Sequence, residues 1–580
     1  MSSEKKERPT AYILFVLMGF LFFFFCLTGK NLAAEGNILW TGRYLFRTLV
    51  LSLLGGGIAG AAVCFGLYRL AADRRGNGEK TVSRRNWPWG AVFGGSFLLL
   101  VLGWLPGFLA YYPAICAYDS PTQVGQIAER SFIDHHPLAH TLLIKWAMDF
   151  GRSVLGSVNR GIAAYALLQV CLLAAVFAFG LLRLYRHGVR PLWLIVLLVL
   201  LMVFPFNTYM SVSVTKDTIF SAFFVLQVLS LYEMLDGYLP EKRITWRELL
   251  FFFSTLGMIL FRNNGQYAFL VLTAVLFLIV LAGRKNRKWF GRMLLWSAAG
   301  LLAGNAALAA LFQLTGAQQG DKREMLSMPI QQMARCMIYH GGVEVLPEDD
   351  NTMDEDDKAL IRDFILDEGY REYDPVISDP VKRHTNTYVV RYRLKDFASA
   401  YFGLLAQYPG DFINAALALD AGYLYPADVT HATVNTMQNV SGMGYVQTRW
   451  AEEVFANYGI YKDSKWEWLH GQMERWADGN KYLDIPVLRY LFMPGIWVWL
   501  YLLLFGWLVI RREFARCLPL ALLLGYYGTL LLGPAVQLRY IYPMMIAFPF
   551  VFLWSILNPN CKEQGSEQLH QNMEPKNHDR

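Results

Sequence analysis

Residues 11–27 read AYILFVLMGFLFFFFCL, an apolar run that contains no charged side chain. A helix needs about 20 such residues to cross a hydrocarbon layer roughly 30 Å thick. No small-residue cleavage site follows the run, and Lys30 closes it, so a retained first span is expected rather than a cleaved signal. Similar runs recur along the chain, which is 55% hydrophobic and 17% charged, with a mean hydropathy of +0.29. The sequence therefore predicts an all-α polytopic membrane protein.

The basic residues between these runs predict the orientation of the chain. They cluster in every second loop, near residues 5–8, 69–85, 183–190, 242–247, 284–288 and 511–516. Such clusters stay in the cytoplasm, so both termini are expected there and the net charge of +7 does not indicate a nucleic-acid partner. About twelve transmembrane helices are expected, at residues 11–28, 46–68, 90–112, 160–182, 191–207, 218–236, 248–261, 265–283, 293–314, 487–510, 517–533 and 540–557.

This pattern divides the chain into four parts. Residues 1–314 form an N-terminal transmembrane domain with an outer loop at 113–159. Residues 315–486 mix charges and aromatic side chains at helical spacing, which indicates a mainly helical extracytoplasmic domain. Residues 487–557 form the C-terminal transmembrane helices, and the polar tail 558–580 is expected to be disordered in the cytoplasm.

The loops expected on the outer face are 113–159, 208–217, 262–265 and 534–539. Loop 113–159 contains two helix starts: Ser120 as an N-cap followed by Pro121, with Gln123 three residues after the cap, and a second start at Pro137. The second helix is expected to lie along the membrane interface. The run 248–261 is too short to cross alone and ends at Arg262-Asn263-Asn264-Gly265, an irregular segment typical of backbone that lines a site inside the protein.

Two carboxylates in loop 113–159 are candidate catalytic groups. Asp119 follows Tyr118 and precedes the first loop helix, where it could be reactive or could simply complement the positive end of that helix. Asp134 begins the stretch Asp134-His135-His136-Pro137, with His140 one turn beyond His136. That spacing can bind zinc, but the glutamate of an HExxH motif is missing, so no metal ligands are assigned.

Three cations stand at the outer ends of expected spans: Lys216, Arg262 and Arg539. Lys216 could instead pair with its neighbour Asp217, and the arginines could hold backbone carbonyls at helix ends. Ionisable groups near the membrane are costly unless they are paired or hydrated. Their concentration on the face opposite to the basic loops therefore favours binding of a lipid phosphate.

These residues resemble the GT-C class of polytopic glycosyltransferases, in particular a bacterial branch related to protein mannosyltransferases and the aminoarabinose transferase. Asp119, His136-Pro137-Leu138 and the ending Arg539-Tyr540-Ile541-Tyr542-Pro543 are similar to short motifs of that class. The chain departs from the pattern in three ways: Ser120 stands where the class has Glu, one proline follows His136, and the loop comes after the third expected span.

The resemblance implies an inverting transferase that moves a sugar from a polyprenyl-phosphate donor to an envelope glycan, lipid or protein outside the cytoplasmic membrane. Asp119 would be the base, with Asp134 as the second candidate. The residues implied in donor phosphate binding are Lys216, Arg262, Arg539 and Tyr540, and those implied in other substrate contacts are Tyr118, Gln123, His135, His136, Asn263 and Asn264. No cofactor is required, although a divalent cation is compatible with the chemistry.

Two other classes of function compete with this interpretation. A transporter or flippase of a lipid-linked or anionic solute would also place cations along a path, but such proteins usually have short loops and internal repeats, and neither is evident in the sequence. A scaffold or sensor would bind a ligand through residues 315–486, but it leaves the polar span ends unexplained.

Overall fold

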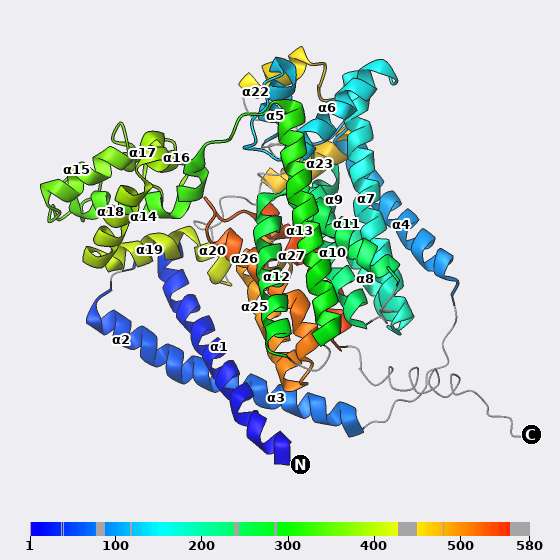
Figure 1. The fold of residues 1–580 in the computed structure, drawn as a ribbon, viewed down its shortest axis with the longest axis horizontal. Helices are drawn as coiled ribbons and strands as arrows, with labels where there is room; N and C mark the ends of the chain where they lie inside the picture. Colours follow the sequence, from blue (N-terminus) through cyan, green and yellow to red (C-terminus); the bar gives the residue numbers. More distant parts are fainter. Residues whose placement is uncertain are drawn as a thin grey trace, which may run out of the picture.

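The chain folds almost entirely into helices (Figure 1). The computed structural model describes residues 2–35, 37–38, 40–76, 87–116, 119–236, 243–283, 287–426, 449–478 and 481–556. Within these ranges, extended pairing is limited to isolated bridges, such as that between Ile115 and Ser213. Tyr118 and the tail 558–580, two parts of the sequence predictions, lie outside the described residues.

The centre of the molecule is a helical bundle arranged around α10 (Lys216–Asp236). In its most apolar stretch 89% of the residues are buried, the highest value among the long apolar helices, because α7, α11 and α27 all pack against it. The other bundle helices are α4 (Trp89–Ala110), α7 (Val158–Arg186), α8 (Pro191–Val203), α9 (Pro205–Val212), α11 (Trp246–Phe261), α12 (Asn263–Leu281), α13 (Arg287–Thr315), α25 (Pro494–Ile510), η5 (Phe514–Cys517), α26 (Leu518–Leu530) and α27 (Leu538–Ile556). A helix packed from several sides is the natural support for a buried site.

In the described ranges, eight helices are long and apolar enough to cross a membrane, and a ninth span results if α8 and α9 are counted as one. The predicted span at 191–207 differs in detail, because α8 and α9 meet at an angle of 57°. Pro205 follows the break, where its ring prevents the preceding residue from continuing the helix. The predicted loop at 208–217 is accordingly helical as far as Val212. The remaining predicted spans coincide with the shorter helices α11, α25 and η5–α26.

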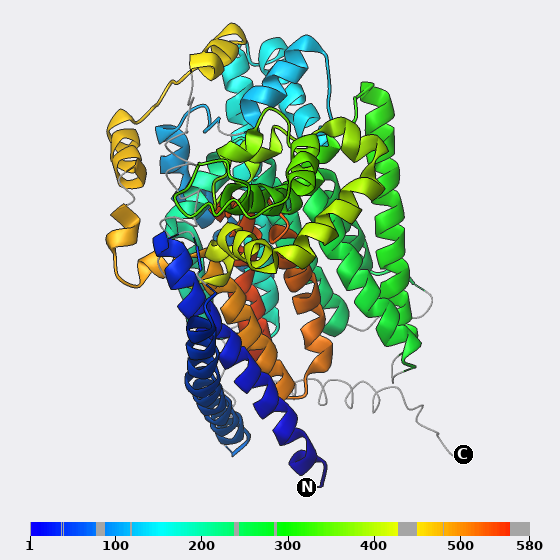
Figure 2. The same cartoon turned by 90° about the vertical axis from the view of Figure 1, so that its left-hand side faces the viewer.

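The N-terminal helices stand beside the bundle rather than within it (Figure 2). They are α1 (Ser2–Glu35), α2 (Gly42–Leu51), the π-helical turn η1 (Ser52–Gly56) and α3 (Gly57–Gly76). Helix α1 crosses η1 and α3 so closely that a methyl group on Gly19, Gly56 or Gly60 would overlap the backbone of the opposite helix. Only 11% of the apolar stretch of α1 is buried, which fits a helix that faces lipid on most sides.

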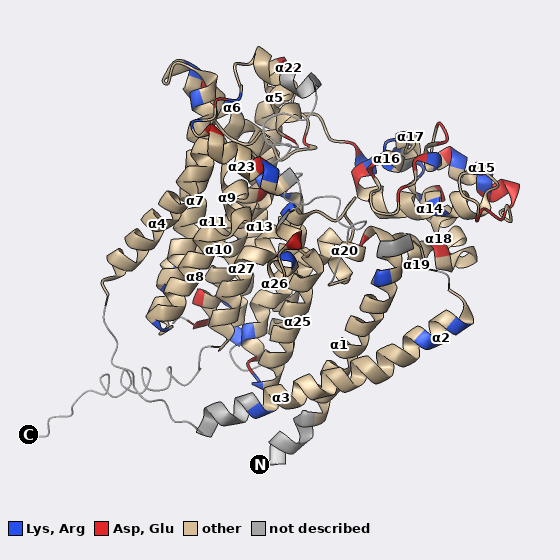
Figure 3. Ribbon diagram, turned by 180° about the vertical axis from the view of Figure 1, so that it is seen from behind, with Lys and Arg blue, Asp and Glu red and all other residues tan. Residues whose placement is uncertain are grey.

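A second, smaller core lies beside the bundle and defines what we call the α14–α19 domain (Figure 1). Its helices are η2 (Lys322–Leu326), α14 (Ser327–His340), α15 (Glu355–Phe364), η3 (Gly369–Glu372), α16 (Asp379–Lys382), α17 (Thr387–Tyr392), α18 (Leu394–Gln407) and α19 (Pro409–Leu419). Helix α20 (Ala421–Leu424) connects it to α25. Charged residues are dense along the ribbon of this domain and sparse along the middle of the bundle (Figure 3).

The later helices of the predicted domain 315–486 do not join this second core. Helix α22 (Arg449–Asn457) packs on α5 (Ser120–Glu129), and α23 (Glu467–Asp478) packs on α4. The short turns η4 (Lys481–Asp484) and α24 (Leu488–Leu491) then lead back to the bundle. Both amphipathic helices therefore bury their apolar faces against the bundle.

The two helix starts predicted in loop 113–159 are confirmed. Helix α5 begins at Ser120, and α6 (Leu138–Ser153) begins directly after Pro137. The N-cap of α5 is Asp119 rather than Ser120, because the Ser120 hydroxyl donates instead to the carbonyl of Val214 at 2.8 Å. This bond fixes the start of α5 against the segment that precedes α10.

Candidate functional site

Backbone pairing of two distant segments builds the core of the site. The Ile115 amide donates to the Val212 carbonyl at 3.0 Å, and the Val214 amide donates to the Ile115 carbonyl at 2.7 Å. This short parallel bridge aligns the residues before α5 with those before α10. As a result, the Lys216 ammonium lies 2.5 Å from a carboxylate oxygen of Asp119.

His136 completes this first group of side chains. Its Nδ1 lies 3.4 Å from the Lys216 ammonium and 3.7 Å from the Asp119 carboxylate. Burial, the largest influence, lowers the pKa of His136 to about 3 despite the nearby carboxylate, so the ring is neutral at pH 7. Because an ammonium has only donors, Nδ1 must accept and the proton must be on Nε2. His136 can therefore offer a substrate an N–H donor, but it cannot supply positive charge.

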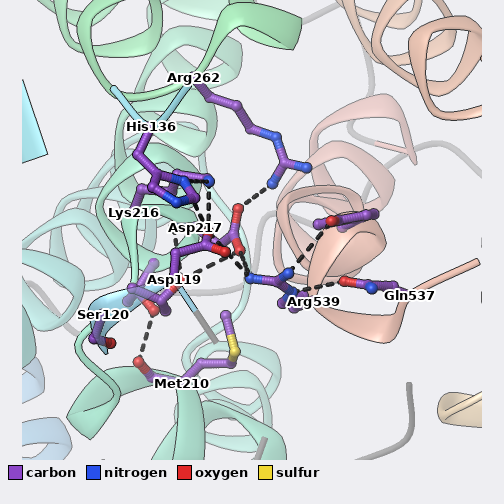
Figure 4. Close-up of polar contacts among 12 residues, drawn as sticks. Asp119, Ser120, His136, Met210, Lys216, Asp217, Arg262, Gln537 and Arg539 are labelled. Carbon is purple, nitrogen blue, oxygen red and sulfur yellow. Dashed lines mark hydrogen bonds and ion pairs between the residues drawn. The ribbon is translucent and has the colours of Figure 1, made fainter. Parts of the chain in front are cut away.

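Asp217 holds a second group together next to the first. Its side chain is fully buried and accepts hydrogen bonds from the guanidinium groups of Arg262 and Arg539, the latter at 3.2 Å. Arg539 also lies 3.7 Å from the Asp119 carboxylate, which links the two groups. Figure 4 shows these side chains pointing toward one another. We call Asp119, Lys216, Asp217, Arg262 and Arg539 the charged cluster.

The helix ends explain why these residues meet. Lys216 and Asp217 begin α10, Arg262 separates α11 from α12, and Arg539 is in the first turn of α27. Asp119 precedes α5, which lies over the same end of the bundle (Figure 1). The charged cluster thus gathers four separate segments at one end of the bundle.

Tyr540 and Gln537 orient the two arginines. The Arg539 Nε donates to Gln537 Oε1 at 2.7 Å, and its terminal nitrogen donates to the Tyr540 hydroxyl at 3.3 Å. The Arg262 guanidinium lies 4.5 Å from the centre of the Tyr540 ring, a cation–π contact. Tyr540, which the resemblance implied in phosphate binding, thus contacts both arginines, whereas sequence reasoning gave Gln537 no role.

The charged cluster carries one positive charge in excess. Lys216, Arg262 and Arg539 are three cations, whereas Asp119 and Asp217 are two carboxylates, and His136 is neutral. Burial raises the pKa of Asp119, but Lys216 and Arg539 outweigh this effect and hold the pKa well below its usual value. The Asp119 side chain remains 23% exposed, the largest exposed fraction among the ion-paired residues of the cluster. An anion that reaches this site therefore meets an electrostatically favourable environment.

Three further predicted residues lie close to the cluster in sequence but have other contacts. The Asp134 carboxylate accepts a hydrogen bond from the Gly320 amide, so it holds the chain that enters the α14–α19 domain. Gln123 is fully buried, and its side-chain amide forms hydrogen bonds with Thr141 and His140 rather than with the charged cluster. His135 is exposed, and its ring makes a T-shaped contact with the ring of His136.

The two asparagines predicted after Arg262 also differ in placement. The Asn264 amide donates to the Thr529 hydroxyl at 3.1 Å and joins α12 to α26. Asn263 is exposed at the start of α12. The sequence predicted an interruption of the helix at this point. In the structure, Arg262 lies at the interruption and is the residue of this segment that joins the charged cluster.

Sequence reasoning considered Asp217 only as an alternative partner for its neighbour Lys216, whereas the structure pairs it with two arginines from distant segments. A charge count could have indicated this role of Asp217, because three cations at span ends need more than one carboxylate to neutralise them. His136 and His140 do not form the zinc site that their spacing allows, because both ring nitrogens of His140 are hydrogen-bonded, one to Gln123 and one to Tyr165. Within the described ranges no group of three or more His, Cys, Asp or Glu side chains is placed to hold a metal ion.

The architecture defines the class as a helical membrane protein with a charged site at one end of its bundle. The chain belongs to a family of unknown function, DUF6020, whose pattern matches residues 97–572. No curated protein and no solved structure matches the chain. The match includes every residue of the charged cluster and leaves out α1 to α3, so the site lies in the part that defines the family.

Proposed function

We propose that this protein is an inverting membrane glycosyltransferase that moves a sugar from a polyprenyl-phosphate donor to an extracytoplasmic acceptor in the cell envelope. One observation carries the proposal: Asp119 shares a single site with Lys216, Arg262 and Arg539, as the chemistry of a phosphate leaving group requires. The acceptor is an envelope glycan, lipid or protein. The reaction needs no cofactor.

In this proposal the acceptor hydroxyl attacks the anomeric carbon while the bond from that carbon to the phosphate oxygen breaks. Asp119 takes the hydroxyl proton, and the electron pair of the broken bond leaves with the lipid phosphate. A general base typically contributes about 10²–10⁴-fold to such a step. The exposed fraction of Asp119 makes it the carboxylate of the cluster that an acceptor can reach.

The ion pair with Lys216 makes Asp119 a weak base before substrate binds, because its pKa is held low. A donor phosphate would compete for the ammonium of Lys216 and for the guanidinium of Arg539. As these cations turn toward the phosphate, the pKa of Asp119 rises and the carboxylate becomes a better proton acceptor. Donor binding would thus prepare the base, and fixed cations would stabilise the growing charge on the leaving phosphate.

The membrane arrangement is part of the proposal. Eight long helices, the bent pair α8–α9 and the shorter helices α11, α25 and η5–α26 together provide twelve crossings of the cytoplasmic membrane. The basic loops then face the cytoplasm together with both termini, and the charged cluster faces outward with the α14–α19 domain. Short helices can cross where neighbouring protein, rather than lipid, surrounds their ends.

The decisive experiment incubates purified protein with polyprenyl-phosphate sugars and envelope acceptors and measures glycosylated product. Asp119→Asn is expected to lower the rate at least 10²-fold while the purified protein remains folded, because the amide keeps the shape but cannot take the proton. Asp134→Asn is the matched control and should keep transfer, since its carboxylate binds the Gly320 amide. Full activity of Asp119→Asn would exclude it as the base.

A flippase predicts a different result from the same preparation. A flippase would move a lipid-linked substrate across the vesicle membrane without changing its covalent structure. Neither the wild-type protein nor Asp119→Asn would then form glycosylated product. Product formation by wild-type protein, and its loss in Asp119→Asn, therefore separates the transferase from the transporter.

A further inference from the structure

A cavity of about 580 Å³ lies on the other side of α9 from the charged cluster. Three elements line it: the last two turns of α4 from Gly103 to Gly107, the α8–α9 break from Val203 to Tyr209, and α23 from Leu469 to Trp476. Its volume falls in the range of about 300–1,000 Å³ that is typical of small-molecule sites. None of the charged cluster residues lines it.

Small and apolar side chains form most of its wall. Gly103 and Gly107 let the side chains of Met202 and Thr208 pack closely on α4. From α23 the wall is completed by Leu469, Met473 and Trp476, together with the polar side chains of Gln472 and Arg475. At the rim, Val203 is 57% exposed, on a helix apolar enough to face lipid. The cavity is therefore continuous with a surface that suits hydrocarbon rather than water.

The break between α8 and α9 is stabilised rather than accidental. The Asn207 side chain donates to the Leu201 carbonyl at 2.8 Å and accepts from the Tyr542 hydroxyl at 2.9 Å. Irregular backbone within a membrane is found where it is buried in protein or lines a cavity. Here the break turns α9 away from α8 and forms one wall of the space.

Helix α23 covers the cavity, and its tryptophans suit a position at the membrane surface. The Lys465 amide donates to the Leu109 carbonyl at 2.8 Å, which sets α23 beside the end of α4. The Tyr209 hydroxyl donates to the Met473 carbonyl at 3.0 Å, which joins the lid to α9. Trp466 and Trp468 are 43% and 67% exposed, and exposed tryptophans of this kind anchor helices at the membrane interface.

Helix α9 is the wall that the cavity and the charged cluster share. Thr208 and Tyr209 line the cavity, while the next carbonyl, that of Met210, accepts from Thr218 in the first turn of α10. Lys216 stands at the start of that turn. A lipid could therefore place its charged head in the charged cluster on one side of α9 and its hydrocarbon tail in the cavity on the other side.

We infer that this cavity binds the hydrocarbon chain of a membrane lipid. The proposed function identifies that lipid as the polyprenyl-phosphate donor, and in this respect the inference rests on it. The same chemistry could come from a resident phospholipid, whose acyl chain would fit the same wall. In both cases the cavity binds a hydrocarbon chain. The polyprenyl-phosphate donor and a resident phospholipid can be distinguished by labelling the cavity with a photoreactive form of each.

The test uses the full-length protein in nanodiscs with two photoreactive lipids: a polyprenyl phosphate with a diazirine in its isoprenoid chain, and phosphatidylglycerol with a diazirine in one acyl chain. Labelled peptides are mapped by mass spectrometry. We expect label on α23 and on the last turns of α4. Thr208→Trp and Leu469→Trp, which fill the cavity from opposite walls, should each reduce this label at least fivefold, while Leu102→Trp, 50% exposed on α4, should not.

Preferential labelling by the isoprenoid probe identifies the donor chain, and preferential labelling by the phospholipid probe identifies a resident lipid. The inference is overturned if neither probe labels these helices, or if labelling is unchanged in both filled variants. Asp119→Asn separates this result from the proposed reaction, since it should lose transfer and keep the label. Two variants on different walls guard against a folding defect in one of them.

Discussion

Replacement of Asp217 by asparagine is expected to destabilise the protein more than any other single neutralisation in the charged cluster. The carboxylate is fully buried and accepts from Arg262, Arg539 and the Thr215 hydroxyl. Asp217→Asn would leave two buried guanidinium groups without their main counter-charge. Breaking a buried pair in this way costs about 3–5 kcal/mol, which lowers the ratio of folded to unfolded protein on the order of 10²–10⁴-fold.

The assay is unfolding of the purified variants in mixed micelles by added SDS, followed by tryptophan fluorescence. Asp149→Asn is the matched control, because Asp149 is 50% exposed and its pairing with Lys145 on the surface of α6 contributes at most about 1 kcal/mol. Asp119→Asn should fall between the two, since its carboxylate is partly exposed. If Asp217→Asn unfolded within about 0.5 kcal/mol of the control, the buried arginines would not depend on this carboxylate.

Three further outcomes follow from named contacts. Arg539→Ala should weaken binding of a polyprenyl-phosphate donor more than binding of an acceptor, and an unchanged donor affinity in a direct binding assay would remove it from the phosphate site. Hydrogen bonding to Asp411, the largest influence, raises the pKa of His340 to about 8. The protonated ring should therefore stabilise the folded protein fully below pH 6.5, and this contribution should be lost as the pH rises through 8. In His340→Gln the thermal stability should depend less on pH over this range. Gly56→Val should separate α1 from the helix it crosses and slow disulfide crosslinking between cysteines placed in the two, whereas Gly66→Val, which meets open space, should not.

The sequence predicts the helical elements of this fold well because they depend on local patterns. Apolar length indicates the long spans, and N-cap chemistry with proline indicates the starts of α5 and α6. The polar segment at Arg262 correctly marks the break between α11 and α12. The course of the chain at 191–212 was harder to predict, because Pro205 permits either a loop or a redirected helix and only packing on α4 and α7 selects the helix.

The candidate site was predictable in its residue types and only partly in its contacts. Polar groups at helix ends indicated Asp119 and the three cations, since such groups are costly near a membrane without a purpose. Which carboxylate pairs with which cation depends on tertiary packing across more than 300 residues, as the contact between Asp217 and Arg539 shows. The same limit applies to Gln123, which the resemblance implied in a substrate contact but whose side chain is fully buried against His140.

The charge of the cluster agrees with the proposed transfer at both ends of the reaction. Three cations face two carboxylates, and a phosphodiester donor adds a single negative charge, so the loaded site is neutral. When the sugar leaves, the phosphate becomes a monoester of about −2, and Asp119 becomes neutral because it has taken the acceptor proton. The gain of charge on phosphate and its loss on Asp119 cancel, and the site stays neutral throughout. A cluster with the same cations but a permanently charged partner at 119 would hold excess negative charge in a poorly solvated place, which is why the base and the phosphate site must lie in contact with the same cations.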